Sequence, residues 1–212
     1  YQQPKVAIRP GPLKSFDGRK FMVAMSPDTV PVCAETGSVQ ALFAYKPWPD
    51  VMPDITRYRE LFENQHGRVA PPIMTVDLGF CHESEDKALE LAHKYVGKYF
   101  DSFAEHYEIF GSHLTNSKSY SHYGGAGDAL KAVGHQEMVD GFVASNIWGT
   151  PKQILDKYEE RRAIIGDMQP CMTFSFSGMS YGEVEASMSL YSREVMPELR
   201  RRWGEMRAPE AA

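Results

Sequence analysis

Four short apolar runs alternate with helical segments along the chain, and this alternation limits the possible folds more than any other feature. The runs predict strands at residues 21–25, 39–44, 73–81 and 171–176. A helix between two strands carries the chain back to the end of the sheet where the first strand began, so consecutive strands run parallel. The sequence therefore predicts an α/β fold built on a parallel sheet.

Capping residues and glycine stops predict where the helices begin and end. Thr150 with Gln153, and Ser180 with Glu183, have the spacing of a capping box, in which two side chains satisfy amides of the first turn. Gly67 suits the end of the helix before it. These signals predict helices over residues 53–66, from the acidic turn at 82–86 toward 110, over 151–165, and from 181 onward with a kink at Pro197.

The composition narrows the class of protein. The 212 residues include 23 basic and 28 acidic side chains, for a formal net charge of −5, and no basic surface broad enough for nucleic acid is evident. No apolar stretch approaches the length that crosses a membrane. Cys33, Cys81 and Cys171 are odd in number and lie among apolar residues, which favours free thiols in a reducing compartment. We therefore expect a cytoplasmic protein with neither nucleic acid nor a membrane as a partner.

The stretch 21–37, FMVAMSPDTVPVCAETG, is the strongest candidate for a binding site. Its apolar run ends at Met25, and Ser26 and Pro27 then predict a helix with a hydroxyl at the cap and a proline at the first helical position. Free amides and the positive end of the helix dipole at this junction suit an anion, and Ser26 and Thr29 add hydroxyl groups. The alternative is an ordinary helix start, in which Ser26 only caps its own helix.

A long polar segment over residues 111–148 interrupts the strand and helix pattern, with short helices expected at 128–133 and 137–144. Segments of this length in compact domains are often lids over a site. Four side chains could then exclude water from that site, and a solvated loop is the alternative. The candidates are His113, Tyr120, His122 and Tyr123.

Other chemical motifs are sparse. The seven histidines form no His-Glu-x-x-His pattern, so no metal site is expected, and neither a phosphate-binding Gly-rich loop nor a nucleophile elbow is present. His82 follows a predicted strand, where barrel enzymes gather catalytic residues, although such a residue also suits a helix cap. Asp77 lies in an otherwise apolar strand and would be costly to bury, yet no motif supplies its partner.

Several segments together resemble the bacterial luciferase-like flavin-dependent monooxygenases. They are VAMSPDT followed by CAETG, the flanking strands FMVAM and ALF, WGTPKQILDKYEE before a strand, and SMSLYSREVMPELR. The likeness covers nearly the whole chain but only the carboxyl-terminal half of that family's (β/α)8 TIM barrel. It implies that residues 1–212 form this half of one barrel domain, with four strands and a loop insertion at 111–148. The Pro-rich start at Tyr1 looks like the interior of a longer polypeptide, so a missing amino-terminal half or a second chain is expected.

The resemblance also implies a function. Members of this family are oxidoreductases that use reduced FMN and O2 to oxygenate a small organic substrate, and the likeness implies a flavin reductase as a partner and a homo-oligomer. It places the FMN phosphate at Ser26 and Thr29, a main-chain contact at Met25, and a flavin-facing side chain at Val23. The family's catalytic histidine and phosphate-binding arginines fall in the amino-terminal half. The catalytic residues are therefore unknown, and this chain alone is expected to bind flavin weakly.

Two alternatives stay open from the sequence. One is a non-catalytic flavin-binding or subunit-interface protein built on a shortened barrel. The other is an oxidoreductase that uses a deazaflavin for hydride transfer, as related barrels do. The substrate cannot be named from these residues.

Overall fold

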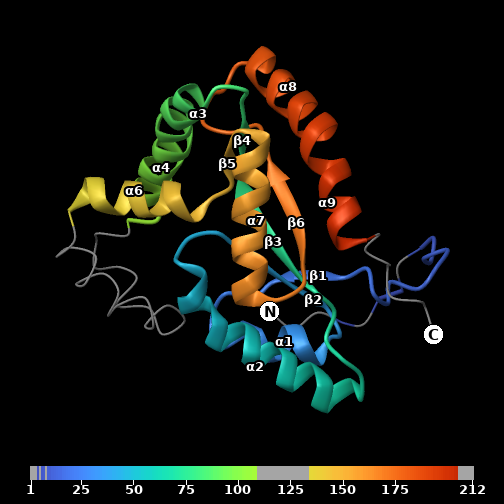
Figure 1. Cartoon of the computed structure of the whole chain (residues 1–212). Helices are drawn as coiled ribbons and strands as arrows, with labels where there is room; N and C mark the ends of the chain where they lie inside the picture. The colour runs from blue at the N-terminus through green and yellow to red at the C-terminus, as the bar shows by residue number, and fades with distance from the viewer. Residues whose placement is uncertain (1–3, 5, 8, 109–133, 205–212) are drawn as a thin grey trace.

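The computed structural model describes residues 4, 6–7, 9–108 and 134–204, and it confirms the parallel α/β fold (Figure 1). A four-stranded sheet has the order β1-β2-β3-β6, with every neighbouring pair parallel. Two further short strands, β4 and β5, pair in parallel just beyond the carboxyl end of β3. The bounds are β1 Phe21–Val23, β2 Val39–Phe43, β3 Ile73–Leu78, β4 Phe80–Cys81, β5 Trp148–Gly149 and β6 Met168–Thr173.

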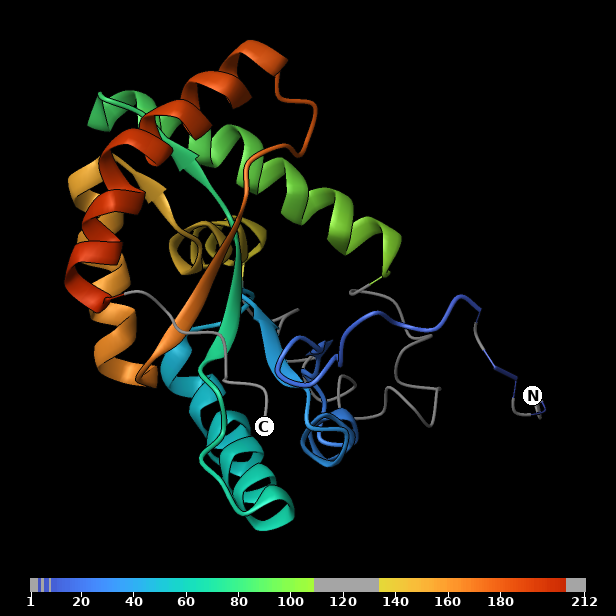
Figure 2. The same ribbon diagram turned by 90° about the vertical axis from the view of Figure 1, so that its right-hand side faces the viewer.

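The helices lie around this sheet, with α7 crossing in front of it and α1 and α2 packed together at one end (Figure 1). The view turned by 90° shows α7 and α9 on one side of β3 and β6 (Figure 2). None of the described helices is both long and apolar enough to cross a membrane. The bounds are α1 Thr29–Glu35, α2 Trp48–His66, α3 Glu85–Ala92, η1 His93–Gly97, α4 Lys98–His106, α6 His135–Ser145, α7 Pro151–Ile165, α8 Tyr181–Leu190, η2 Tyr191–Val195 and α9 Met196–Trp203.

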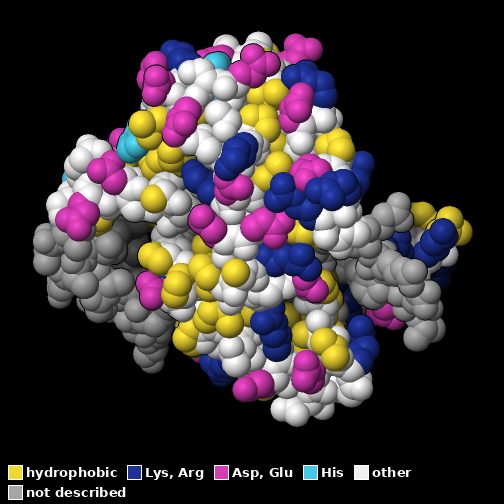
Figure 3. Space-filling view, in the orientation of Figure 1, with side chains coloured by type: hydrophobic (Ala, Val, Ile, Leu, Met, Phe, Trp, Pro, Cys, Tyr) yellow, Lys and Arg dark blue, Asp and Glu magenta, His cyan; other side chains and the backbone are white. Residues whose placement is uncertain are grey.

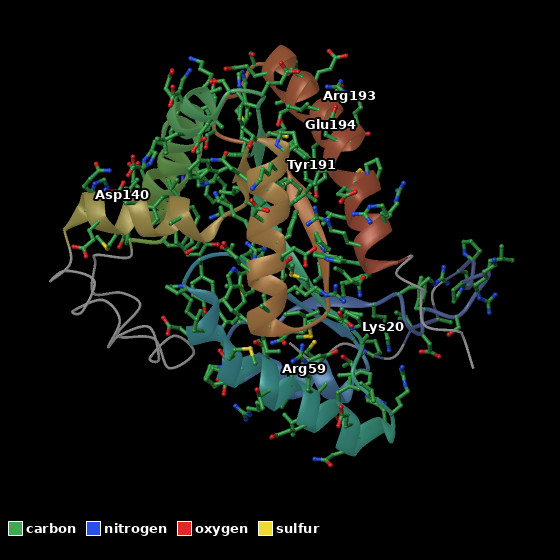
Figure 4. The ribbon with its side chains drawn as sticks, viewed as in Figure 1. Lys20, Arg59, Asp140, Tyr191, Arg193 and Glu194 are labelled. Carbon is green, nitrogen blue, oxygen red and sulfur yellow. The ribbon has the colours of Figure 1, made fainter. Side chains whose placement is uncertain are left out.

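The face of the sheet toward the helices carries the main core. Along β3 the side chains of Ile73, Thr75 and Asp77 are buried, and the alternate ones are only partly buried. Apolar side chains from α1, α2, α7 and η2 join this core. Arg59 of α2 donates to Ile165 O at 2.6 Å, which ties α2 to the end of α7 (Figure 4).

The opposite face of the sheet is partly open. Phe21, Val23 and Phe43 are 47, 51 and 45% exposed. The register places Val23 beside Ala41 and Phe43 beside Val76, so these apolar side chains share the face that points away from the main core. In a closed barrel such a face is the interior, and the free edges of β1 and β6 would pair with further strands.

A second, smaller core holds α6 against the rod formed by α3, η1 and α4. Val139 and Val143 of α6 pack with Val96 and Phe100 of that rod. Two histidine–aspartate contacts flank this core, with His135 Nε2 2.8 Å from Asp101 and His93 3.6 Å from Asp140, which lies on α6 (Figure 4). The helix predicted at 137–144 is thus confirmed as part of α6, while the one predicted at 128–133 lies outside the described residues.

The start of α2 was predicted wrongly. This helix begins at Trp48 rather than at Pro53, which lies inside it. Trp48 is buried, and the guanidinium carbon of Arg161 lies 4.4 Å from its ring centre. Packing of the first turn therefore outweighs the one helical hydrogen bond that Pro53 removes.

Two other boundaries differ for identifiable reasons. Strand β6 runs over Met168–Thr173 rather than 171–176, because its register with β3 sets Met168 beside Ile73. The kink expected at Pro197 is preceded by the π-helical turn η2, Tyr191–Val195, and a wider turn accommodates the amide that proline lacks. Both predicted capping boxes, at Thr150 and at Ser180, are confirmed.

Candidate functional site

The junction after β1 has the hydrogen bonds of a capping box. Ser26 N donates to Thr29 Oγ1 at 3.1 Å, and Thr29 N lies 3.3 Å from Ser26 Oγ. The two hydroxyl oxygens are 3.0 Å apart, and the Thr29 hydroxyl also donates to Ser26 O at 3.0 Å. Helix α1 begins at Thr29, so the prediction that Pro27 takes the first helical position is wrong. Pro27 and Asp28 instead form a turn, which closes with a bond from Thr29 N to Ser26 O.

Few donors at this junction remain free for an anion. Pro27 and Pro31 have no amide hydrogen, while the amides of Thr29 and Val30 bond to Ser26 O. Among the described residues, Asp28 N–H has no acceptor. Because Thr29 donates its hydroxyl proton to Ser26 O, the Ser26 hydroxyl is the donor in the 3.0 Å contact with Thr29 Oγ1, and it would have to exchange that bond to donate to a ligand. The anion-binding capacity is therefore smaller than the sequence predicted, and it centres on Ser26.

A guanidinium that the sequence did not reveal lies beside this junction. Arg57 of α2 donates from Nη1 to Pro27 O at 3.2 Å, and its side chain is exposed. It brings positive charge to the turn that holds Ser26. No sequence signal marks Arg57, because only the packing of α2 against α1 brings it there.

The other two predicted cofactor residues differ in their surroundings. Val23 is 51% exposed on the open face, where it is free to contact a ligand or another segment. Met25 follows the end of β1, is partly buried and packs against the main core, and its main-chain contact stays a prediction.

His82 lies just before Ser84, the cap of α3, and holds the amide of that residue. Its Nδ1 accepts from Ser84 N at 2.9 Å, while the Ser84 hydroxyl caps α3 by accepting from Lys87 N. His82 also lines a groove of about 560 Å³ between β4, α3 and α8, together with Cys81 and Arg193. These contacts are explained by a structural role, and a catalytic role for His82 stays a prediction.

Asp77 has the partner that the motifs did not reveal. Arg161 of α7 binds it through two hydrogen bonds of 2.7 Å, and the two side chains are 0 and 3% exposed. Arg161 also donates to Ser145 O at 3.2 Å and stacks on Trp48. A signal was present, since Arg161 continues the buried stripe of Ile154 and Tyr158 along α7. An arginine on an apolar stripe indicates a buried acidic partner.

Two further predictions concern the lid and a metal site. His113, Tyr120, His122 and Tyr123 lie outside the described residues. Within the part of the chain that is described, no three His, Cys, Asp or Glu side chains gather in a way that could hold a metal.

On the face shown in Figure 3, basic and acidic side chains are interspersed.

The three cysteines are free, as predicted, and they should differ in reactivity. Burial raises the pKa of Cys33 to about 11 and the pKa of Cys81 to about 12, so neither forms an appreciable thiolate at pH 8. Cys171 is only partly buried. We expect a disulfide reagent at pH 8 to modify one thiol quickly and the other two only after denaturation. A Cys171→Ser variant should lose the fast phase, and two fast thiols in the native chain would contradict this.

The comparisons with known proteins agree with this fold. The family model described as luciferase-like monooxygenase matches residues 1–168. The monooxygenase RslO1 from Streptomyces bottropensis superposes with a TM-score of 0.59 at 16% identity, over 83% of this chain and 46% of its own. No curated protein sequence matches the chain.

Two further structures carry different cofactors in their names. The oxygenating constituent of 3,6-diketocamphane monooxygenase from Pseudomonas putida, in complex with FMN, gives a TM-score of 0.57 at 15% identity, over 84% of this chain and 47% of its own. The coenzyme F420 dependent tetrahydromethanopterin reductase from Methanopyrus kandleri gives a TM-score of 0.53 at 19% identity, over 84% of this chain and 50% of its own.

The chain thus spans about half the length of these structures. Its parallel four-stranded sheet with one open face is a partial barrel, as the resemblance implied. The family match covers well over half of the residues. The chain belongs to the luciferase-like monooxygenase family.

Proposed function

We propose that this chain forms part of a flavin-dependent monooxygenase that uses reduced FMN and O2 to oxygenate a small organic substrate. Its membership of the family supports this class of reaction. The single observation that carries the role of this chain is the pair of donors in the turn after β1: the Ser26 hydroxyl, 3.0 Å from Thr29 Oγ1, and the Asp28 amide, which has no acceptor among the described residues. These are donors of the kind that a phosphate ester requires.

The residues at this junction are chemically suited to an FMN phosphate, but we expect them to bind it only weakly on their own. Ser26 would donate its hydroxyl proton, Thr29 would hold Ser26 in place, and Arg57 would supply positive charge. The exposed carboxylate of Asp28 opposes an anion here. We therefore expect weak binding by this chain alone, and stronger binding once further cations join it.

The open sheet face supplies the apolar part of the proposed site. Val23 lies on it between Phe21 and Phe43, and all three side chains are about half exposed. We propose that an amino-terminal half of the same barrel, or a second polypeptide, covers this face and pairs with the edges of β1 and β6. Covering it would exclude water from the cofactor and complete the substrate pocket.

In this proposal the bound reduced FMN supplies the oxygen chemistry, while the protein positions it. Val23 and its neighbours provide an apolar surface for the flavin ring, and Met25 a main-chain contact. A flavin reductase would supply the reduced cofactor, and the assembled enzyme would be a homo-oligomer. The free thiols support a reducing compartment such as the cytoplasm.

Titration with FMN tests the phosphate site. Ser26→Ala should weaken FMN binding by roughly tenfold, the loss expected for one hydrogen bond to a charged group. Flavin fluorescence quenching measures the affinity of the full chain. Riboflavin, which lacks the phosphate, should bind the native and variant chains alike.

Ser84→Ala is the matched control for that titration. Ser84 caps α3, and like the Ser26 hydroxyl its hydroxyl accepts from the amide three residues further on. Helices α3 and α1 lie at opposite ends of the fold (Figure 1). Loss of the Ser84 hydroxyl should lower stability by about 1 kcal/mol and leave FMN affinity unchanged. Equal FMN affinity in the native chain and in Ser26→Ala would show that Ser26 is only a helix cap.

The likeness to the coenzyme F420 dependent reductase favours a deazaflavin as the second candidate cofactor. Difference spectra with FMN and with a deazaflavin would separate the two. Intact mass of the purified protein would reveal a second chain, which is then included in the assay. If flavin binds tightly but no oxygen is consumed, the result would instead support a non-catalytic flavin-binding or subunit-interface protein. Sedimentation at several concentrations would report self-association through the open sheet edges.

A further inference from the structure

Helix α6 rests on the rod formed by α3, η1 and α4 through a small core that is separate from the main one (Figure 1). Its buried side chains are Val139 and Val143. The fit is close, because a Cβ atom at Gly97 would lie 3.2 Å from Val139 Cγ1. Gly97 belongs to the π-helical turn η1, so α6 packs where the rod is locally wider. With so small an apolar core, the polar contacts beside it have a large share in holding α6 in place.

Two histidine–aspartate pairs flank this core, and they run in opposite directions between the helices. His135 at the start of α6 has its Nε2 2.8 Å from Asp101 Oδ1 of α4. Asp140 in the middle of α6 has its Oδ1 3.6 Å from Nδ1 of His93, the first residue of η1. Both α6 and the rod thus contribute one imidazole and one carboxylate. The four side chains are between 41 and 60% exposed, so both imidazoles can exchange protons with water.

The charges around the two pairs are mixed but mainly acidic. The Asp140 carboxylate also accepts from Gln136 Nε2 at 2.8 Å, and the amino end of α6 opposes a positive charge on His135. Three of the five other charged residues within one helical turn of the pairs, among those that the structure describes, are glutamates. The five are Glu90, Lys94, Lys98, Glu105 and Glu137. Together with the two aspartates they give an acidic surrounding, which favours protonated imidazoles.

We propose that α6 is a pH-sensitive latch, which is held most firmly against the rod when His93 and His135 are protonated. An imidazolium attracts the aspartate opposite it, whereas a neutral imidazole offers at most an uncharged hydrogen-bond partner. Histidine side chains take up their proton between about pH 7.5 and 5.5, while aspartates stay ionised down to about pH 4. The attraction at both pairs therefore grows as the pH falls from 8 to 5.5.

The latch acts on one edge of the sheet. Asn146 directly follows α6 and binds Leu78 N and Ala44 O, which lie at the carboxyl ends of β3 and β2. This contact anchors the last turn of α6, and His135 lies at the opposite end of the helix. Opening of the latch therefore begins at the start of α6 and loosens the support of this edge. The latch does not depend on flavin binding, so its test is independent of the proposed function.

Amide hydrogen exchange of the full chain at pH 5.5 and at pH 8.0 tests the latch. The rates are corrected for the intrinsic exchange rate at each pH and assigned by peptide mass spectrometry. We expect the protection of residues 138–144 to be roughly fivefold greater at pH 5.5, the combined effect of two solvent-exposed ion pairs. Helix α7 contains no histidine and serves as the internal reference, against which the change is measured.

Histidine variants make the test specific. His93→Gln and His135→Gln keep a polar side chain without a titrating charge, so each should lower the pH effect to roughly twofold, and the double variant should abolish it. His135→Lys carries a permanent charge and should raise α6 protection at pH 8 above that of the native chain.

His106→Gln is the matched control for these variants. His106 lies at the end of α4, and its Nδ1 contacts Ser102 O of the same helix at 2.7 Å, so the full pH effect should remain when it is replaced. Equal α6 protection at the two pH values in the native chain would overturn the proposal. A pH effect that survives in the double variant would overturn it as well.

Discussion

Replacing Arg161 with methionine is expected to lower the free energy of unfolding by about 3–5 kcal/mol. The substitution leaves the Asp77 carboxylate in a site where it is 0% exposed and has lost both of its 2.7 Å hydrogen bonds. An unpaired buried charge costs far more than the pair itself contributes, because desolvation is no longer compensated. Urea unfolding followed by circular dichroism measures the change.

Two further variants separate burial from charge loss. Arg162→Met removes the neighbouring arginine, which is partly exposed and pairs with the exposed Asp167 at 2.6 Å, and should cost under about 1 kcal/mol. The double variant Asp77→Leu with Arg161→Met should regain most of the lost stability, since no buried charge remains. A single Arg161→Met variant as stable as Arg162→Met would show that the buried pair of Asp77 and Arg161 does not have the structural role assigned to it.

Replacing Asn146 with leucine is expected to cost about 2–4 kcal/mol, the second largest effect. The buried Asn146 amide joins three segments: its Oδ1 accepts from Leu78 N at 2.8 Å, and its Nδ2 donates to Ala44 O at 3.0 Å and to Phe142 O at 2.9 Å. Leucine has a similar volume but no polar atom, so the buried backbone groups of β3 and of the turn after β2 lose their partner.

This change should also act locally. Asn146 connects the carboxyl ends of two strands to the end of α6, so its loss should increase amide exchange in α6 more than in α2. Asn64→Leu is the matched control, because Asn64 is exposed on α2, and it should stay within about 0.5 kcal/mol of the native chain. Equal losses for the two variants would contradict the role assigned to the Asn146 hydrogen bonds.

Local chemistry accounts for the parts of the fold that were predicted correctly. The strand and helix alternation, the capping boxes at Thr150 and Ser180, and the glycine after α2 depend on residues within a few positions of one another. Such signals act in the unfolded chain as well, so they can be read without the fold. The resemblance to the family rests on the same local segments and is confirmed.

Prediction was wrong where distant packing decides the outcome. Trp48 belongs to α2 because Arg161 packs on it, and the register with β3 moves β6 toward Met168. Strand β5 was not expected at all, since two residues make a strand only when β4 lies beside them. In each case the deciding partner is many residues away, and its position depends on the completed fold.

The sequence by itself determined the alternation of parallel strands and helices, because apolar periodicity and helix caps are properties of neighbouring residues. It also determined that Ser26 and Thr29 adjoin the end of a strand. Only the tertiary structure decided that Arg161 satisfies Asp77 across 84 positions and that Arg57 reaches Pro27. Buried and converging charges take their partners from whichever segments the closed core brings together, and no local pattern specifies them.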